Sequence, residues 1–310
     1  MSFAFGVDIG GTTVKIGMVS DEGKILEKWE IKTDTSNKGE NILPDVAASI
    51  KAKIEEEKLD KSQISGIGIG VPGPVDSKGI VHNAVNLGWG TFNVDEKMKE
   101  LTGFTCRTGN DANVAALGEM WKGGGMGYSD IVMVTLGTGV GGGIIVDGKV
   151  LNGSVGAGGE IGHIHVNDDE TIPCGCGNYG CLEQYASATG IARTASEMLK
   201  TWDKKTVLTA QDTSAKAVFD GVKAGDELCI EVAKKFGEVL GKGLSVIADV
   251  VNPEAFVIGG GVSKAGEVVL DYIRPSMTKN IFKGASNAKL VLATLGNDAG
   301  AIGAAKLVLQ

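Results

Sequence analysis

Hydrophobic residues follow two alternating kinds of pattern along the chain. Continuous apolar runs over 3–8 and 64–71 predict buried strands, and similar stretches predict further strands at 14–19 and 24–31. Over 40–59, in contrast, apolar residues recur at every fourth position, which predicts a helix. Strands that alternate with helices favour an α/β architecture.

The opening pattern recurs near the middle of the chain. Residues 4–26 and 131–151 both read as strand, Gly/Thr-rich turn, strand, glycine-centred hairpin and strand, and both end in Gly-Lys-Ile/Val-Leu. This repeat predicts two related halves, although two glycine-rich hairpins can also resemble each other by chance. The remaining patterns predict helices at 94–101, 113–121, 183–199, 212–222 and 226–248 and from 299, and strands at 255–258 and 290–293.

Composition narrows the class of protein. The chain has 310 residues, of which 43% are hydrophobic and 22% charged, so we expect packed cores and about two domains. The net charge of −8 and the absence of a Lys/Arg-rich run argue against nucleic-acid binding. The sequence has no apolar run long enough to span a membrane and no visible signal peptide, so we expect a cytoplasmic protein that does not bind membranes.

The 48 glycines are the unusual feature, because glycine is normally only about 7% of residues. With 6 prolines and no G-X-Y repeat, the chain is not a collagen. Several glycines cluster directly after predicted strands: Gly10-Gly11 within Asp8–Thr13, Gly137–Gly143 and Gly259–Gly261. Glycine-rich turns let backbone N–H groups converge on a phosphate, and an adjacent acid such as Asp8 can hold Mg²⁺. For Gly10-Gly11, a tight hairpin that binds no ligand would give the same sequence pattern.

Two nucleotide-binding motifs are matched only in spacing. Residues 137–142 read G-x-G-x-x-G, but the chain continues into a strand and a hairpin turn, whereas a dinucleotide site requires a helix there. Residues 143–149 have the G-x4-G-K spacing, but Val150 replaces the Ser or Thr that would hold Mg²⁺. We therefore reject both the Rossmann and the P-loop interpretations.

A second group of polar residues lies at Asn110-Asp111-Ala112-Asn113, where a predicted helix begins. Aspartate is a favoured helix N-cap. It is also a suitable general base for a hydroxyl substrate. The spacing leaves both interpretations of Asp111 open.

A metal site is predicted by one histidine and three cysteines. His163 is followed eleven residues later by Cys174, Cys176 and Cys181, which together complete a tetrahedral zinc set. A core histidine with buried free thiols is the alternative. With all four positions filled by protein, we expect a closed, structural zinc site that fixes its loop and the nearby Glu183.

Taken together, these motifs resemble the ROK family of sugar kinases and repressors over essentially the whole chain. The similarity rests on Asp8–Thr12, Asn110–Asn113, Leu136–Gly143, Glu160–His163 and Cys174–Glu183, with no departure from the family pattern there. The resemblance implies an actin-like, ribonuclease-H-like duplicated fold with two domains flanking a cleft. We expect a small α/β domain over 1–112 plus 299–310 and a large one with the zinc loop over 113–298.

The resemblance also implies ATP, catalytic Mg²⁺, structural Zn²⁺ and a hexose, in a homodimer or homotetramer. Residues 83–89 and 183–187 look most like bacterial ROK glucokinases, so we expect ATP-dependent phosphorylation of the glucose 6-hydroxyl with Asp111 as general base. The expected sugar-binding residues are Gly73, Asn86, Asn110, Asp111, Glu160, His163 and Glu183. The expected nucleotide-binding residues are Asp8, Gly10, Gly11, Thr12, Thr13, Lys15, Gly137, Thr138, Gly139, Gly260 and Gly261.

Two alternatives remain at this level. Kinases for fructose, N-acetylmannosamine or N-acetylglucosamine share these motifs. Repressors of the family carry a helix-turn-helix domain ahead of the first phosphate loop, and only seven residues precede Asp8, so we expect a kinase.

Overall fold

A computed structural model describes residues 2–309. In this part of the chain, no helix is both long enough and apolar enough to cross a membrane. The chain forms two compact units. The first contains residues 1–127, 143–159 and 295–310, and the second contains residues 128–142 and 160–294.

The first unit is built on a five-stranded mixed sheet with the order β3-β2-β1-β4-β7. Strand β1 is antiparallel to β2 and parallel to β4, which is itself parallel to β7. The strands are β1 (Phe3–Ile9), β2 (Thr13–Ser20), β3 (Ile25–Lys32), β4 (Ile64–Val71) and β7 (Cys106–Asn110). A short hairpin, β5 (Ile80–Val81) and β6 (Phe92–Asn93), adds a separate two-stranded sheet.

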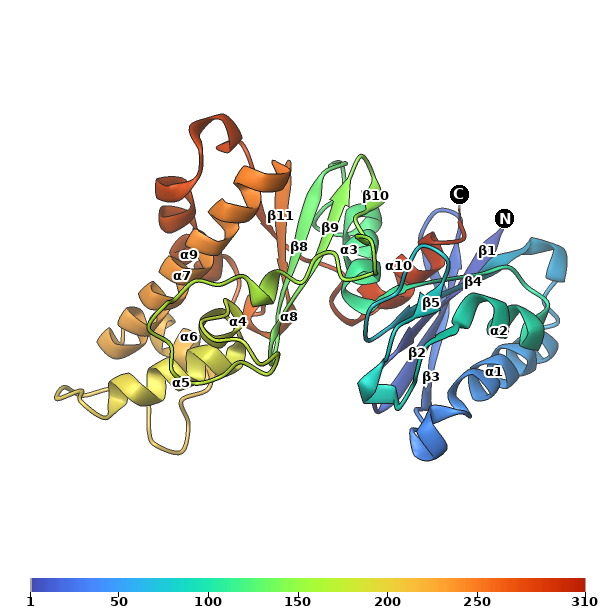
Figure 1. Ribbon diagram of the computed structural model, residues 1–310, viewed down its shortest axis with the longest axis horizontal. Helices are drawn as coiled ribbons and strands as arrows, with labels where there is room; N and C mark the ends of the chain where they lie inside the picture. The colour runs from blue at the N-terminus through green and yellow to red at the C-terminus, as the bar shows by residue number, and fades with distance from the viewer. Residues whose placement is uncertain (1, 310) are drawn as a thin grey trace. The chain divides into compact units, whose positions relative to one another are not determined.

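Helices cover both faces of this sheet (Figure 1). Because side chains alternate along a strand, Phe5 and Val7 of β1 pack in one core with α1 (Ile42–Glu56) and α2 (Val94–Thr102). Ala4 faces the opposite way and packs with Ala305 of α10 (Ala299–Lys306). Helix α3 (Asp111–Lys122) packs on α10.

Many of the glycines serve this packing. A Cβ on Gly6 or Gly68 would overlap the backbone of α10. A Cβ on Gly118 of α3 or on Gly303 of α10 would overlap the backbone of the other helix, so glycine at both positions lets these helices pack closely. The sequence pattern gave a role only to the three glycine clusters that follow predicted strands, and these packing glycines lie outside those clusters.

The second unit holds most of a sheet with the order β10-β9-β8-β11-β12. Its strands are β8 (Ile131–Leu136), β9 (Val140–Val146), β10 (Lys149–Val150), β11 (Ala255–Gly259) and β12 (Lys289–Leu292). Strand β11 is parallel to both β8 and β12. The long helix α7 (Glu227–Val251) lies beside α9 (Glu267–Asn280) (Figure 1). The remaining helices are α4 (Glu183–Ala186), α5 (Ala188–Leu199), α6 (Ala215–Lys223) and α8 (Gly260–Ser263).

The two sheets repeat one order, in which β1, β2, β3, β4 and β7 correspond to β8, β9, β10, β11 and β12. The prediction of two related halves is thereby confirmed.

Three expectations from the sequence need correction or remain open. The helix predicted at 183–199 is broken at Ser187, whose side chain caps α5, and β7 was not predicted. The compact units differ from the expected domain limits at α3 and at residues 143–159, and those limits stay a prediction.

Candidate functional site

In the first unit, the predicted site residues gather at one edge of the sheet. Strands β1, β4 and β7 are parallel, with Asp8 level with Gly70 and Val71 level with Asn110. The turns that follow these strands therefore leave the sheet at the same edge, where open α/β sheets bind their ligands. Asp8, Gly73 and Asp111 lie at or just beyond these strand ends.

The first glycine turn is held by its own backbone and by Thr33, the residue that follows β3. Gly10 N–H donates to Thr13 O at 3.0 Å, and Thr33 donates its hydroxyl to Gly10 O at 2.7 Å. Asp8 packs against Gly300 in the first turn of α10 and lies level with Lys15 of β2. Burial raises the pKa of Asp8, and the Lys15 charge offsets this in part. A nearby cation would stabilise the ionised form, so the carboxylate is suited to hold Mg²⁺.

Asn110, not Asp111, is the N-cap of α3. Its Oδ1 accepts hydrogen bonds from Ala112 N–H at 3.0 Å and Asn113 N–H at 3.2 Å. Its Nδ2 donates to Gly73 O at 3.1 Å and so ties the end of β7 to the loop after β4. Asp111 is the first residue of the helix and is half-buried, with one carboxylate oxygen accepting from Ala112 N–H at 2.8 Å. The N-cap interpretation of Asp111 is therefore wrong, because Asn110 caps the helix.

In the second unit, two glycine turns lie side by side. Gly137–Gly139 follows β8 and Gly260 follows β11, and these strands are parallel neighbours. Gly260 has φ of 84° and approaches the backbone of Leu136 so closely that a Cβ would overlap it. Glycine is required there on both counts. The expected nucleotide residues of this unit thus share one edge of its sheet.

The predicted zinc ligands form a compact group. Cys174 Sγ lies 3.7 Å from His163 Nδ1, and Cys176 Sγ lies 3.7 Å from Cys181 Sγ. All four donor atoms lie within 4.8 Å of one another. In a tetrahedron with zinc–ligand distances of about 2.0–2.3 Å, neighbouring ligand atoms are roughly 3.5–3.8 Å apart. The donor set and its spacing fit Zn²⁺, with no position left open for water.

The segments predicted to bind the sugar and the phosphates in this unit meet at Val140. Glu183 in α4 accepts a hydrogen bond from Val140 N–H at 2.9 Å, and its other oxygen lies 3.5 Å from Cys174 Sγ. Gly162 packs against the backbone of Val140 so closely that a side chain would not fit. The segments 160–163 and 174–183 are therefore both fixed to the end of the second glycine turn.

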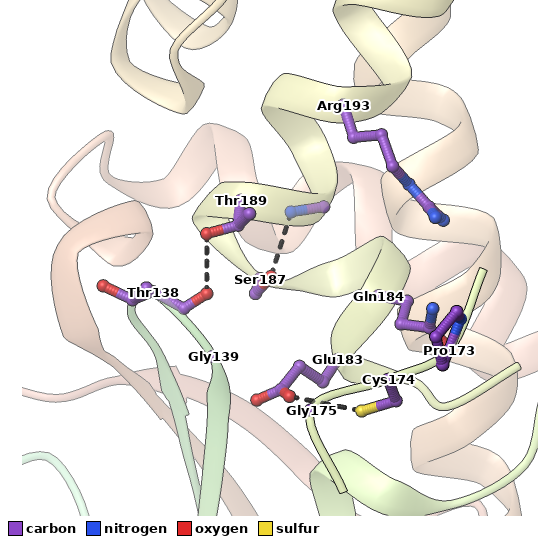
Figure 2. A pocket seen from close by; sticks show the side chains of 11 residues that line it. Thr138, Gly139, Pro173, Cys174, Gly175, Glu183, Gln184, Ser187, Thr189 and Arg193 are labelled. Atoms are coloured by element: carbon purple, nitrogen blue, oxygen red, sulfur yellow. Dashed lines mark hydrogen bonds between the residues drawn. The ribbon is translucent and has the colours of Figure 1, made fainter. Parts of the chain in front are cut away.

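Two pockets adjoin these turns. The first has a volume of about 400 Å³ and lies between the second glycine turn (Gly137–Gly139), α5 and the loop that carries the three cysteines, called the zinc loop below. Figure 2 shows Glu183, Thr138 and Thr189 in its wall. The second, of about 370 Å³, is lined by residues of α6, by Ala188 and by the segment that begins at Gly261. Apolar groups such as Phe219 and Ala265 and the charged Lys216, Lys223 and Lys264 all contribute to its lining.

The predicted residues divide between the two units. Asp8, Gly10, Gly11, Thr12, Thr13, Lys15, Gly73, Asn86, Asn110 and Asp111 belong to the first, and Gly137, Thr138, Gly139, Glu160, His163, Glu183, Gly260, Gly261 and the three cysteines belong to the second. Asn86 and Glu160 are exposed. Sequence reasoning missed Thr189 and the ion pair of Glu170 with Arg193, since none of these residues stands in a recognisable motif.

Comparison with known proteins identifies the class. A family model described as the ROK family matches residues 4–310. A glucokinase of Halalkalibacterium halodurans is 43% identical, covering 98% of this chain and 94% of that protein. A glucokinase of Thermotoga maritima is 36% identical, covering 98% of this chain and 96% of that protein.

Solved structures agree with this comparison. A ROK family glucokinase from Streptomyces griseus in complex with glucose and AMPPNP superposes with a TM-score of 0.77 at 35% identity and covers 99% of both chains. The two β-sheets of the same strand order give this chain the fold of that sugar kinase. The chain belongs to the ROK family.

Proposed function

We propose that this protein is a glucokinase that transfers the γ-phosphoryl group of ATP to the 6-hydroxyl of glucose. The observation that carries the proposal is the 43% identity to a glucokinase over nearly the full length of both chains. The position of Asp111 supports it, because this half-buried carboxylate at the end of β7 is suited to accept the proton of a hydroxyl.

Asp111 is the proposed general base. It accepts the proton of the 6-hydroxyl as that oxygen forms a bond to the γ-phosphorus, and the bond from the γ-phosphorus to the bridging oxygen breaks to release ADP. Asn110 fixes the start of α3 and the carbonyl of Gly73, and so sets where the Asp111 carboxylate stands. Glu160, His163, Glu183, Asn110, Gly73 and Asn86 are the proposed sugar-binding residues.

The nucleotide is proposed to bind along the glycine turns. Gly10 and Gly137 close the two turns with their own N–H groups, and Gly11, Thr12, Thr138 and Gly139 supply backbone N–H groups to the phosphates. The hydroxyls of Thr12, Thr13 and Thr138 and the positive charge of Lys15 add to this site. The pocket beside Gly260 and Gly261 would hold the base and ribose against its apolar groups. Asp8 would hold the Mg²⁺ ion, which neutralises charge on the phosphates.

The metal cluster has a structural role in this proposal. His163, Cys174, Cys176 and Cys181 would hold Zn²⁺ and fix the positions of Glu183 and of the 160–163 segment. The cytoplasmic location and the homodimeric or homotetrameric state expected from the sequence stay predictions.

The test is a coupled assay of ADP release with ATP and a panel of hexoses. We expect glucose to give the highest kcat/KM. A clear preference for fructose, N-acetylmannosamine or N-acetylglucosamine would replace glucose by another hexose of the same reaction. No ADP release with any sugar, in protein that binds sugar, would favour a sugar-responsive regulator.

A further inference from the structure

The second glycine turn is held by the start of α5 through two successive carbonyl groups. Ala188 N–H donates to Gly137 O at 2.8 Å, and the hydroxyl of Thr189 donates to Thr138 O at 2.9 Å. Figure 2 shows the hydrogen bond of Thr189 as a dashed line. At the end of the turn, Val140 N–H donates to Glu183, so α4 and α5 together hold three consecutive parts of the turn.

These contacts fix the direction of the N–H groups. In a trans peptide the C=O and the next N–H point in opposite directions, and the described residues include no cis peptide bond. Because Gly137 O and Thr138 O both point to α5, the N–H groups of Thr138 and Gly139 point away from that helix. Two successive N–H groups directed to the same side are the arrangement that binds a phosphate.

The start of α5 is itself well fixed. Ser187 is buried and caps the helix by accepting a hydrogen bond from Gly190 N–H at 3.0 Å. Ala188 is therefore anchored as part of the helix backbone, whereas Thr189 contributes through its side chain. Only the second of the two carbonyl contacts depends on the identity of a side chain, and it can be removed by substitution.

We propose that Thr189 is a positioning residue for the phosphoryl donor. Its hydroxyl holds the Thr138–Gly139 peptide so that the Gly139 N–H faces the nucleotide phosphates. This inference rests on the proposed function, in that it takes the second glycine turn to be a phosphate turn, and it adds a residue outside the family motifs on which that function was based.

The test compares three variants. Thr189→Val keeps the shape of the side chain and removes the hydroxyl, and Thr189→Ser keeps the hydroxyl. The matched control is Thr201→Val, since Thr201 is also exposed and donates its hydroxyl to a backbone carbonyl, that of Met198 at 3.4 Å, beyond the other end of α5. For each variant we would measure kcat, both KM values and the melting temperature, and titrate AMPPNP by calorimetry.

Thr189→Val is expected to raise the KM for ATP and the Kd for AMPPNP between about twofold and tenfold, the range for one lost hydrogen bond. The KM for glucose should stay unchanged, Thr189→Ser should restore most of the loss, and Thr201→Val should behave as wild type. Equal nucleotide affinity in Thr189→Val and wild type would overturn the inference. So would a rise in both KM values with a lowered melting temperature, which would indicate a general structural role.

The calorimetric arm separates this inference from the proposed function. If the wild type releases no ADP with any sugar but binds AMPPNP more tightly than Thr189→Val, the proposed function fails and the role of Thr189 stands. If the wild type phosphorylates glucose and the variant does so equally well at low ATP, only the role of Thr189 fails. A wild type that binds no nucleotide would overturn both.

Discussion

The carboxylate of Glu170 lies 2.7 Å from the guanidinium of Arg193 in α5. The same oxygen accepts a hydrogen bond from Tyr185 Oη at 2.7 Å, and the other accepts from Ile172 N–H at 3.0 Å. Glu170 precedes the three cysteines in the zinc loop, so this network attaches the loop to α4 and α5 independently of the metal ligands. The side chain of Glu170 is only 9% exposed, which makes the pair stronger than an ordinary surface ion pair.

Replacement of Glu170 by Gln is expected to destabilise the protein by about 2 kcal/mol, in the range for hydrogen bonds to a charged group. Burial alone raises the pKa of Glu170, but the hydrogen bonds from Tyr185 and Ile172 and the charge of Arg193 outweigh it and lower the pKa to about 2, against an ordinary value of 4.5. The stability from this group is therefore fully present above about pH 4.5 and is lost as the pH falls towards 2.

Chemical denaturation of wild type and Glu170→Gln across this range would measure the effect. The difference in free energy of unfolding should be largest at neutral pH and should shrink as the pH falls below 4.5. Glu238→Gln on an exposed part of α7 is the control and should show no such difference. A difference between Glu170→Gln and wild type that does not change with pH would contradict the assignment.

Elements with a signal in their own residues could be predicted from the sequence, whereas elements that depend on distant partners could not. Strand β4 was predicted with its observed limits, because a continuous apolar run over Ile64–Val71 is typical of a strand buried on both faces. Strand β7, in contrast, reads Cys-Arg-Thr-Gly-Asn and has no apolar run, so only its pairing with β4 makes it a strand. The break at Ser187 was missed because the apolar spacing continues across the capping residue.

The same distinction applies to the site. The four predicted zinc ligands could be recognised from the sequence because three of them are cysteines that lie within eight residues. The hydrogen bond of Thr189 to Thr138 and the ion pair of Glu170 with Arg193 join residues 51 and 23 positions apart, at distances in sequence where no pattern predicts a contact. Close packing at Gly6 and Gly68 depends on α10, which is remote in sequence.

Freshly purified protein is expected to contain about one zinc ion per chain, measured by mass spectrometry of the metal. Cys176→Ser should lose most of this zinc and melt at a lower temperature, because serine is a poor zinc ligand. Cys176 is exposed, so the substitution removes little packing, and the loss can be assigned to the metal. Removal of zinc from the wild type by a chelator should lower the melting temperature in the same way.

Cys229→Ala provides the control for this prediction. Cys229 is buried in α7, away from the cluster, so its loss should lower stability through packing while the zinc content stays unchanged. Purified wild type without zinc, or a Cys176→Ser variant with full zinc, would show that these four residues do not form a zinc site.

Glu119 provides a second stability prediction. Its side chain is buried, and its two oxygens accept hydrogen bonds from Gly124 N–H and Leu295 N–H, both at 2.8 Å. The bond to Leu295 anchors the start of the segment 295–309, which includes α10, to the end of α3. Glu119→Ala leaves both N–H groups without this partner and should cost about 2–4 kcal/mol.

Urea unfolding would measure this loss, and hydrogen exchange at Gly124 and Leu295 would locate it. Glu119→Gln can accept with only one of its two terminal atoms and should lose roughly half as much. The exposed Glu100→Ala in α2 should be close to wild type. Unchanged exchange at Leu295 in Glu119→Ala would show that the segment is held by other contacts.

Asp111→Asn tests the proposed general base most directly. The amide keeps the shape of the side chain at the start of α3 but cannot accept the proton of a sugar hydroxyl. The expected loss in kcat is on the order of 10²–10⁴, the usual contribution of a general base. The affinity for glucose, measured by calorimetry, should change far less. The melting temperature should stay near that of wild type because Asn110 supplies the helix cap.

Asn110→Ala is the matched comparison. It removes the cap and the bond to Gly73 O, so it should lower both stability and glucose affinity while Asp111 is still present. Turnover by Asp111→Asn within tenfold of wild type would mean that proton transfer to this carboxylate does not limit the reaction.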